Sequence, residues 1–326
     1  MGTPTTDEAR RSQHGPSPYL DLNNGVKLPA LGLGVFLSPP EQTADAVETA
    51  IHNGYRLIDT AAAYNNERQV GEGIRRSGIG RADIFVTTKL WVADYGHDAA
   101  LRAFDASLRR LGVDYIDLYL LHWPVPSDFD ATVAAYKAAE TLLAEGRARA
   151  IGACNFSPQH LENLLRQTDV VPAVNQVELH PYFTQRDVRD TNARHAVLTQ
   201  SWSPIGGVYD RNQQLRDVTK PLENPVIVDL ATKHGKTAAQ IILRWHLAHG
   251  FSAIPKSVTA SRIAETSTSS TSRSNPKRSP PSTPSTPGYA PAPTRRGSTP
   301  TRSQSPLTNE ETASYGDAAD SERHPE

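Results

Sequence analysis

Residues 115–122 read Tyr-Ile-Asp-Leu-Tyr-Leu-Leu-His, a short and mostly apolar run that ends in an ionisable side chain. The flanking stretches, 98–111 and 131–145, carry apolar residues three and four positions apart. An apolar run between two amphipathic stretches predicts a buried strand between two helices. The number of such units along the chain then decides the fold.

The same unit recurs along most of the sequence. Further helical patterns cover 41–52 and 238–248. Eight strand and helix units within roughly 240 residues favour a closed (β/α)8 barrel, the TIM barrel, over an open sheet. No Gly-x-Gly-x-x-Gly follows an early strand, so the main signature of an open dinucleotide-binding sheet is missing. The eight candidate strands are 31–34, 56–60, 84–90, 115–122, 148–154, 173–179, 197–202 and 252–255.

Two segments precede the first barrel strand. Residues 1–18 are polar and interrupted by prolines, and we expect a disordered leader there. Residues 20–28 have Asn23, Asn24 and Gly25 at their centre, which predicts a β-hairpin in a position to close the barrel floor. The barrel domain is expected to span 19–265.

Composition excludes several classes of function. With 34 Lys and Arg against 35 Asp and Glu, no overall charge attracts nucleic acid or an anionic membrane. The single cysteine, Cys154, excludes an internal disulfide and a cysteine metal cluster within one chain, and it fits a reducing compartment. No apolar run has the length of a signal core or a membrane span. We therefore expect a soluble cytoplasmic protein.

Ionisable residues stand at the ends of three consecutive candidate strands. Asp59 ends the second, Lys89 the third and His122 the fourth, while Tyr64 follows where the loop turns into a helix. Active groups of (β/α)8 barrels lie at these carboxyl ends. Each residue alone has a structural explanation, as a helix cap, a solvent-facing lysine or a hydrogen-bonded core histidine. Together, among apolar strands, they predict a catalytic site.

This set of side chains suits the reduction of a carbonyl group, which needs a hydride and a proton. A tyrosine with a pKa of about 10 is a weak acid at neutral pH, and the Lys89 ammonium is expected to lower the pKa of Tyr64. Asp59 would keep Lys89 charged and in place. His122 would hydrogen-bond the substrate oxygen and orient it. No metal is needed.

Six motifs in this order resemble the aldo/keto reductases, and among them the 2,5-diketo-gluconate reductase-like branch. This resemblance implies a monomer that uses NADPH to reduce small aldehydes or ketones. The motifs are Asp-Thr-Ala-Ala-Ala-Tyr (59–64), Thr-Lys-Leu-Trp (88–91), Leu-His-Trp-Pro (121–124), Ile-Gly-Ala-Cys-Asn-Phe (151–156), Asn-Gln-Val-Glu-Leu-His-Pro (175–181) and Ile-Pro-Lys-Ser (254–257).

The resemblance also implies a set of cofactor contacts. Asn155 and Gln176 would hold the nicotinamide amide, and Trp202 would stack on the ring where relatives often carry tyrosine. A lysine, an arginine and two hydroxyls near a helix start suit the 2′-phosphate of NADPH, whereas NAD would leave the cations unused. The residues implied for the pyrophosphate loop are Ser203, Pro204, Ile205 and Gly206, and those for the adenosine phosphate are Lys256, Ser257, Val258, Thr259 and Arg262.

Three aromatic residues follow barrel strands and are expected to form an apolar rim for the substrate. They are Phe36, Trp91 and Trp123. Ordinary loop packing is the alternative explanation for them. Cys154 stands where relatives commonly carry serine, a change between two small residues.

The composition changes after Glu265. Residues 266–306 are dominated by Ser, Thr, Pro and Arg, so 266–326 predicts a disordered tail where relatives have the last barrel helix. Back-translation of 266–273 with GC-rich codons, with one base restored in front, gives Asn-Ile-Asp-Val-Phe-Asp-Phe-Ala. This resembles the continuation of the family, and we therefore hypothesise a one-base frameshift after Glu265.

Two other functions stay open at the level of sequence. One is a cofactor-binding regulatory subunit that keeps the barrel and turns over slowly, and the other is an inactive product of a frameshifted gene. A Ser/Thr-Pro interaction tail is a weaker explanation, because the frameshift accounts for those residues without a function.

Overall fold

The computed structural model describes residues 17–206 and 220–270. Residues 1–16 of the expected leader and 271–326 of the expected tail lie outside this part of the chain. Among the described residues, no helix is both long and apolar enough to cross a membrane.

Eight parallel strands form the centre of the fold, and consecutive strands along the chain are neighbours in the sheet. The first and last strands also meet: Leu31 bridges Ala253, Gly34 bridges Lys256, and the Gly32 amide donates to the Ala253 carbonyl at 2.9 Å. These bonds close the sheet, so the fold is the predicted (β/α)8 barrel. The strands are β3 (Leu33–Gly34), β4 (Leu57–Asp59), β5 (Phe85–Leu90), β6 (Ile116–Leu121), β7 (Ala148–Cys154), β8 (Val174–Glu178), β9 (Leu198–Trp202) and β10 (Ser252–Ala253).

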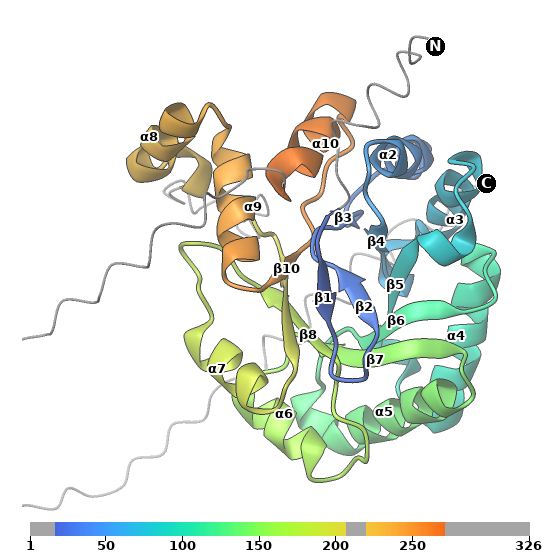
Figure 1. Ribbon diagram of the computed structural model, residues 1–326. Coiled ribbons are helices and arrows are strands. Elements are labelled where there is room, and N and C mark those ends of the chain that lie inside the picture. The colour runs from blue at the N-terminus through green and yellow to red at the C-terminus, as the bar shows by residue number, and fades with distance from the viewer. Residues whose placement is uncertain (1–16, 207–219, 271–326) are drawn as a thin grey trace, which may run out of the picture. The chain divides into compact units, whose positions relative to one another are not determined.

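Helices lie outside the ring of strands (Figure 1). Each strand is followed by at least one helix, as the alternating sequence pattern predicts. Several helices begin at a side-chain cap; Thr237, for example, accepts from the Gln240 amide at 3.2 Å. The helices are α2 (Pro40–His52), α3 (Glu67–Arg76), α4 (His97–Leu111), α5 (Phe129–Ala144), α6 (Pro158–Leu165), α7 (Arg186–Arg194), α8 (Pro225–His234), α9 (Ala238–Ala248) and α10 (Ala260–Ser267).

The predicted hairpin closes one end of the barrel. Strands β1 (Tyr19–Asp21) and β2 (Lys27–Pro29) pair antiparallel around Gly25, whose φ of 83° lies in the left-handed region. The Asn23 amide donates to the Pro172 carbonyl at 3.0 Å and the Asn24 amide to the Arg149 carbonyl at 2.9 Å. Because these carbonyls lie at the amino ends of β8 and β7, the catalytic ends of the strands stay open.

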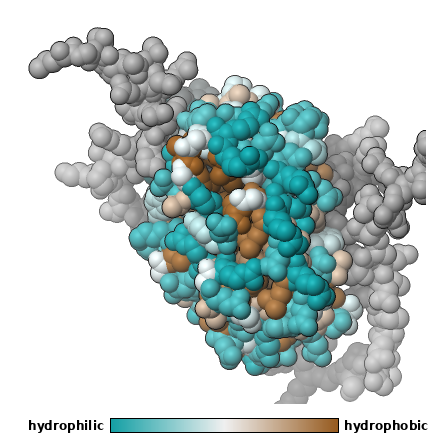
Figure 2. Space-filling view, turned by 90° about the vertical axis from the view of Figure 1, so that its right-hand side faces the viewer, coloured by the Kyte–Doolittle hydropathy of each residue, from teal (hydrophilic) through white to brown (hydrophobic). Residues whose placement is uncertain are grey.

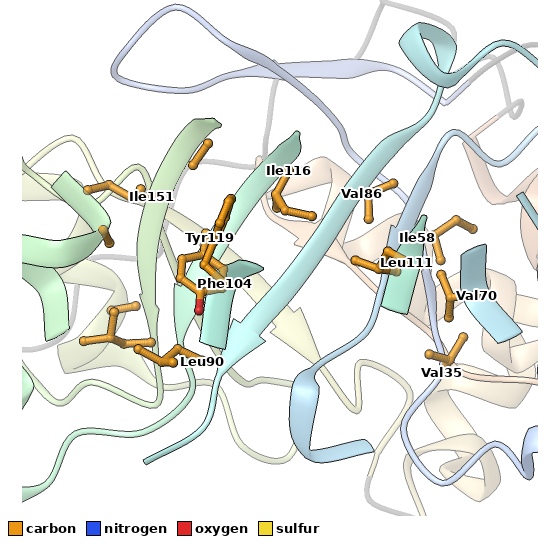
Figure 3. Packing of buried hydrophobic residues seen from close by; sticks show 14 of the residues in the cluster. Val35, Ile58, Val70, Val86, Leu90, Phe104, Leu111, Ile116, Tyr119 and Ile151 are labelled. Carbon is orange, nitrogen blue, oxygen red and sulfur yellow. The ribbon is translucent and has the colours of Figure 1, made fainter. Parts of the chain in front are cut away.

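Apolar side chains form two main layers. One cluster fills the barrel interior and includes Leu28 of the hairpin and Leu118 of β6. The larger cluster lies between strands and helices, where Phe104 of α4 meets Tyr119 of β6 edge to face with ring centroids 4.9 Å apart (Figure 3). The outer surface over one side of the barrel is largely hydrophilic, with smaller apolar areas between (Figure 2).

The described fold continues past the predicted domain boundary at Glu265. Helix α10 runs to Ser267, and a 3₁₀ turn follows over Thr268–Ser270. The Thr266 hydroxyl donates to the Arg262 carbonyl at 2.8 Å and accepts from Tyr55 at 2.9 Å. The change in composition marks the end of the large apolar residues, but hydroxyl side chains do not by themselves end a helix.

Candidate active site

The four predicted catalytic residues come together at the carboxyl ends of the strands. Asp59 is the last residue of β4, Lys89 lies near the end of β5, and His122 directly follows β6. Tyr64 ends a 3₁₀ turn, Ala62–Tyr64, in the loop after β4. Parallel strands in register carry their carboxyl ends to one edge, which explains why three separate sequence motifs meet there.

Lys89 is the centre of this group. Its fully buried ammonium donates to Asp59 Oδ1 at 2.5 Å, to the Thr60 carbonyl at 2.9 Å and to the Tyr64 hydroxyl at 3.4 Å. A lysine ammonium has three donors, and all three have acceptors here. The geometry therefore joins the phenol, the ammonium and the carboxylate in the order that the sequence predicts.

Burial and charge compete at each of these groups. Burial is the largest single effect and lowers the pKa of Lys89, but the opposing effects, led by the charge of Asp59, together hold that pKa above its ordinary value. Burial raises the pKa of Asp59 against the opposing effect of Lys89. Lys89 accordingly stays charged at neutral pH.

The expected lowering of the pKa of Tyr64 is wrong for this structure. Burial raises the pKa of Tyr64 above its ordinary value, and the Lys89 ammonium offsets only part of that increase. Sequence reasoning counted the nearby charge but not the loss of water around the hydroxyl. The phenol is thus protonated at neutral pH, which is the state in which it can donate a proton.

His122 is neutral in this environment. It is 8% exposed, and burial, followed by the nearby Lys89 charge, lowers its pKa well below the ordinary value. Its ring meets the rings of Tyr64 and Trp91 edge to face, with centroids 5.6 and 5.2 Å apart. Its Nδ1 is buried and has no hydrogen-bond partner among the described residues. A neutral imidazole beside Tyr64 can donate one hydrogen bond to a bound oxygen.

Two buried polar residues that the sequence reasoning missed hold the Tyr64 loop. Asn66 accepts from the Thr60 hydroxyl at 2.8 Å and donates to the Val35 carbonyl at 2.9 Å. Glu67 accepts from the Thr88 hydroxyl at 2.6 Å, one residue before Lys89. These bonds tie the loop to Val35, directly after β3, and to β5. The sequence contains the run Asn-Asn-Glu directly after Tyr64, but only the fold shows that its last two residues are buried.

The residues implied for the nicotinamide amide lie beside the catalytic group. Asn155 follows β7 at a φ of 64°, a left-handed conformation that non-glycine residues rarely adopt. Its amide donates to the His122 carbonyl at 3.1 Å and accepts from Trp202 Nε1 at 2.9 Å. Gln176 donates to Asp59 Oδ2 at 2.7 Å. Asn155, Trp202 and Gln176 therefore lie beside the predicted catalytic residues.

The loop implied for the pyrophosphate begins directly after β9. Ser203 has a φ of 47°, and the Pro204 carbonyl accepts from His246 Nε2 at 2.9 Å. Ile205 packs on the larger core cluster, and Gly206 has a φ of 97° with Pro221 against it. The loop therefore has a fixed conformation up to Gly206, and 207–219 lie outside the described residues.

The residues implied for the adenosine phosphate lie after β10. Ser257 accepts from the Thr259 amide at 3.1 Å, while Val258 packs on the larger core cluster. Lys256 and Arg262 are exposed, and no ion pair joins them to any described acidic residue. Two cations near the start of α10 are thus available for an anionic ligand.

Two of the three predicted rim aromatics border the catalytic residues. Phe36 is 41% exposed, and its ring centroid lies 5.0 Å from that of Tyr64. Trp91 contacts His122, as described above. The Trp123 carbonyl accepts from the Tyr95 hydroxyl at 2.5 Å, which fixes the backbone after His122. Among the described residues, no group of three His, Cys, Asp or Glu side chains could hold a metal ion.

A (β/α)8 barrel with tyrosine, lysine, aspartate and histidine at its open end defines a class of carbonyl-reducing oxidoreductases. The sequence matches the aldo/keto reductase family over residues 30–274, and the chain belongs to that family. It is an NADPH-dependent oxidoreductase that reduces carbonyl groups.

Relatives with named activities share much of this sequence. The chain is 58% identical over 253 residues to morphine 6-dehydrogenase of Pseudomonas putida, covering 77% of this chain and 85% of that protein. It is 46% identical over 250 residues to a methylglyoxal reductase of Escherichia coli, covering 76% and 85%. A glyoxal reductase of Bacillus subtilis is 45% identical over 245 residues, covering 75% and 84%.

Solved structures agree with the fold. An aldo/keto reductase from Brucella melitensis is 46% identical with a TM-score of 0.71, covering 77% of this chain and 92% of that one. A Bombyx mori aldo-keto reductase in complex with NADP is 33% identical with a TM-score of 0.72, covering 78% and 87%.

The described residues fit NADPH. Among the described residues, Gln176 Oε1 has only the Cys154 thiol as donor, at 3.8 Å, which leaves this oxygen able to accept from a carboxamide. The two exposed cations after β10 suit a phosphate. When bound, NADPH supplies the hydride.

Proposed function

We propose that this chain reduces small aldehydes and ketones, with Tyr64 as the proton donor. The observation that carries this proposal is the contact from Lys89 Nζ to the Tyr64 hydroxyl at 3.4 Å, with Asp59 behind the lysine at 2.5 Å. The protonated phenol donates its proton to the substrate oxygen as the carbonyl becomes an alcohol. The Lys89 ammonium then stabilises the phenolate, and Asp59 keeps the lysine charged.

His122 orients the substrate in this proposal. As a neutral ring beside Tyr64, it donates a hydrogen bond to the carbonyl oxygen without adding a second positive charge next to Lys89. Phe36, Trp91 and Trp123 provide apolar surface around the reacting carbonyl. The names of the relatives support small aldehydes and dicarbonyls as the first substrates to test.

The cofactor contacts are part of the same proposal. Gln176 and Asn155 bind the carboxamide, and Trp202 covers the nicotinamide ring. Lys256 and Arg262 bind the 2′-phosphate, which favours NADPH over NADH. The resemblance of the barrel to aldo/keto reductases supports a monomer, and the single buried cysteine supports the cytoplasm as its compartment.

The test is NADPH oxidation with a panel of small aldehydes, dicarbonyls and cyclic ketones. Tyr64→Phe keeps the ring and removes the proton, so turnover should fall by about 10²- to 10⁴-fold with little change in NADPH affinity. Tyr136→Phe is the matched control, because its buried hydroxyl has no partner among the described residues and lies in the core. Normal turnover in Tyr64→Phe would refute the assignment. Folded wild-type protein that binds NADPH without turnover would instead favour the regulatory-subunit alternative.

A further inference from the structure

A chain of hydrogen bonds crosses the barrel interior from the catalytic lysine to the last strand. Asp59 accepts from Lys89 on one oxygen and from Gln176 Nε2 on the other, at 2.7 Å. The same Gln176 nitrogen donates to Gln200 Oε1 at 2.7 Å, and Gln200 Nε2 donates to Ser252 Oγ at 3.0 Å. All five side chains are buried. Gln200 and Ser252 have no assigned part in the reaction.

The direction of this chain is set from its charged end. An ionised Asp59 only accepts hydrogen bonds, so Gln176 must turn its amide nitrogen toward that carboxylate. The same nitrogen faces Gln200, which must therefore present its carbonyl oxygen. Gln200 then has its nitrogen toward the Ser252 hydroxyl, which can accept. Each amide has one orientation that is compatible with these hydrogen bonds, although oxygen and nitrogen are otherwise similar in shape.

This orientation leaves one atom of Gln176 for a ligand. Both hydrogens of its amide nitrogen are used, by Asp59 and by Gln200. Within the part of the chain that the structure describes, its Oε1 has only the Cys154 thiol, a weak donor at 3.8 Å. Burial raises the pKa of Cys154 to about 12, so this group remains a thiol and does not repel the oxygen as a thiolate would. A primary amide of a ligand is a stronger donor that suits this acceptor.

We propose that Gln200, held by Ser252, is a positioning residue that fixes the Gln176 amide with its carbonyl oxygen available to the carboxamide of NADPH. This inference rests on the proposed role of Gln176 in cofactor binding. Without an acceptor at position 200, one hydrogen of the Gln176 amide is unpaired, and only the bond to Asp59 holds the amide, so its plane is less restricted. The loss then falls on the nicotinamide end of the cofactor and not on its adenosine end.

The experiment compares binding of two ligands to the full chain. NADPH carries the carboxamide, whereas 2′-phosphoadenosine diphosphoribose lacks the nicotinamide. In Gln200→Leu, we expect the Kd of NADPH to rise roughly five- to tenfold, the equivalent of one hydrogen bond. The Kd of 2′-phosphoadenosine diphosphoribose, called the fragment below, should be unchanged. Gln200→Glu should restore NADPH binding, because a buried, protonated carboxyl group can accept from Gln176 and donate to Ser252.

Thr199→Val is the matched control on the same strand. Thr199 accepts from Asn192 Nδ2 at 3.0 Å on the opposite face of β9, so this variant also loses one buried hydrogen bond. It should leave the ratio of the two Kd values unchanged. Equal weakening of both ligands in Gln200→Leu, or a ratio like that of Thr199→Val, would refute the inference.

A second variant and the wild-type chain separate the remaining outcomes. If Gln200→Leu does not fold, Ser252→Ala replaces it, and a selective rise in the NADPH Kd supports the inference while an unchanged ratio refutes it. If the wild-type chain binds the fragment and NADPH equally and reduces no carbonyl compound, the proposed function fails as well. Wild-type turnover together with an unselective Gln200→Leu variant refutes only the positioning role.

Discussion

Replacing Asp59 with asparagine tests whether the carboxylate is what allows a charged lysine inside the barrel. Asparagine has nearly the same shape, so the change removes charge with little loss of packing. Lys89 is fully buried and Asp59 nearly so, which means that solvent cannot take over the role of the carboxylate. Removal of one partner of a buried ion pair lowers the free energy of unfolding by about 3 to 5 kcal/mol. If the buried lysine is neutral instead, its deprotonation at pH 7 lowers the free energy of unfolding by about 5 kcal/mol, because the ordinary pKa of lysine is about 10.4.

The stability of the variant should also depend on pH. In the wild type the pKa of Lys89 is raised on folding, so its contribution is present below pH 10.4 or so and is lost above the folded pKa. In Asp59→Asn the folded pKa falls below the unfolded one, and the sign reverses. The difference in unfolding free energy between wild type and variant should therefore shrink from pH 7 to pH 9.

Urea unfolding followed by tryptophan fluorescence measures both effects. The double variant Asp59→Asn, Lys89→Met removes the second charge, and we expect it to be more stable than Asp59→Asn alone. Asp21→Asn is the control, because Asp21 pairs with Lys27 on the exposed hairpin, and its unfolding curve should match that of the wild type. A double variant less stable than Asp59→Asn would refute the reasoning.

Three further outcomes follow from other parts of the chain. Burial lowers the pKa of His246 to about 4, so its contribution to the free energy of unfolding is present above pH 6.5 or so and is lost as the pH falls toward 4. The free energy of unfolding should therefore fall by about 2 kcal/mol between pH 7 and 5. Urea unfolding of His246→Gln should lack this dependence on pH. Lys256→Ala with Arg262→Ala should raise the KM for NADPH roughly 10- to 100-fold and leave the KM for NADH unchanged, and equal effects on both would argue against a 2′-phosphate site. A chain with the reading frame restored after Glu265 should melt higher and be more soluble than the chain as written, and a wild-type midpoint above about 50 °C with normal turnover would contradict this.

The last of these outcomes has a basis in the described residues. Ser267 at the end of α10 and Ser269 in the following 3₁₀ turn are buried, and their hydroxyls donate to nearby carbonyls, those of Ala264 and Thr266. The restored frame would place isoleucine and valine at these two positions. A buried aliphatic side chain contributes about 1.5 to 3 kcal/mol, which is large against a total of about 5 to 15 kcal/mol.

The fold could be predicted from the sequence because its signals are local and repeated. Each barrel strand is a short apolar run, and all eight runs were bounded within two residues of the observed strand. The hairpin follows from turn residues at Asn23, Asn24 and Gly25. Helix α10 runs to Ser267, beyond the expected boundary at Glu265, because a change in composition does not show where hydroxyl side chains still complete a helix.

The sequence by itself determined the barrel and brought Asp59, Tyr64, Lys89 and His122 to one end of it, because parallel strands in sequential order leave little choice about where strand ends meet. Only the tertiary structure decided how these groups behave. Desolvation raises the pKa of Tyr64 where the sequence predicted a lower value, and it depends on every neighbour that excludes water. The Gln176 amide likewise has its hydrogen-bond partners, Asp59 and Gln200, at distant positions, and no local pattern distinguishes the side chain of Gln200 from any other polar residue.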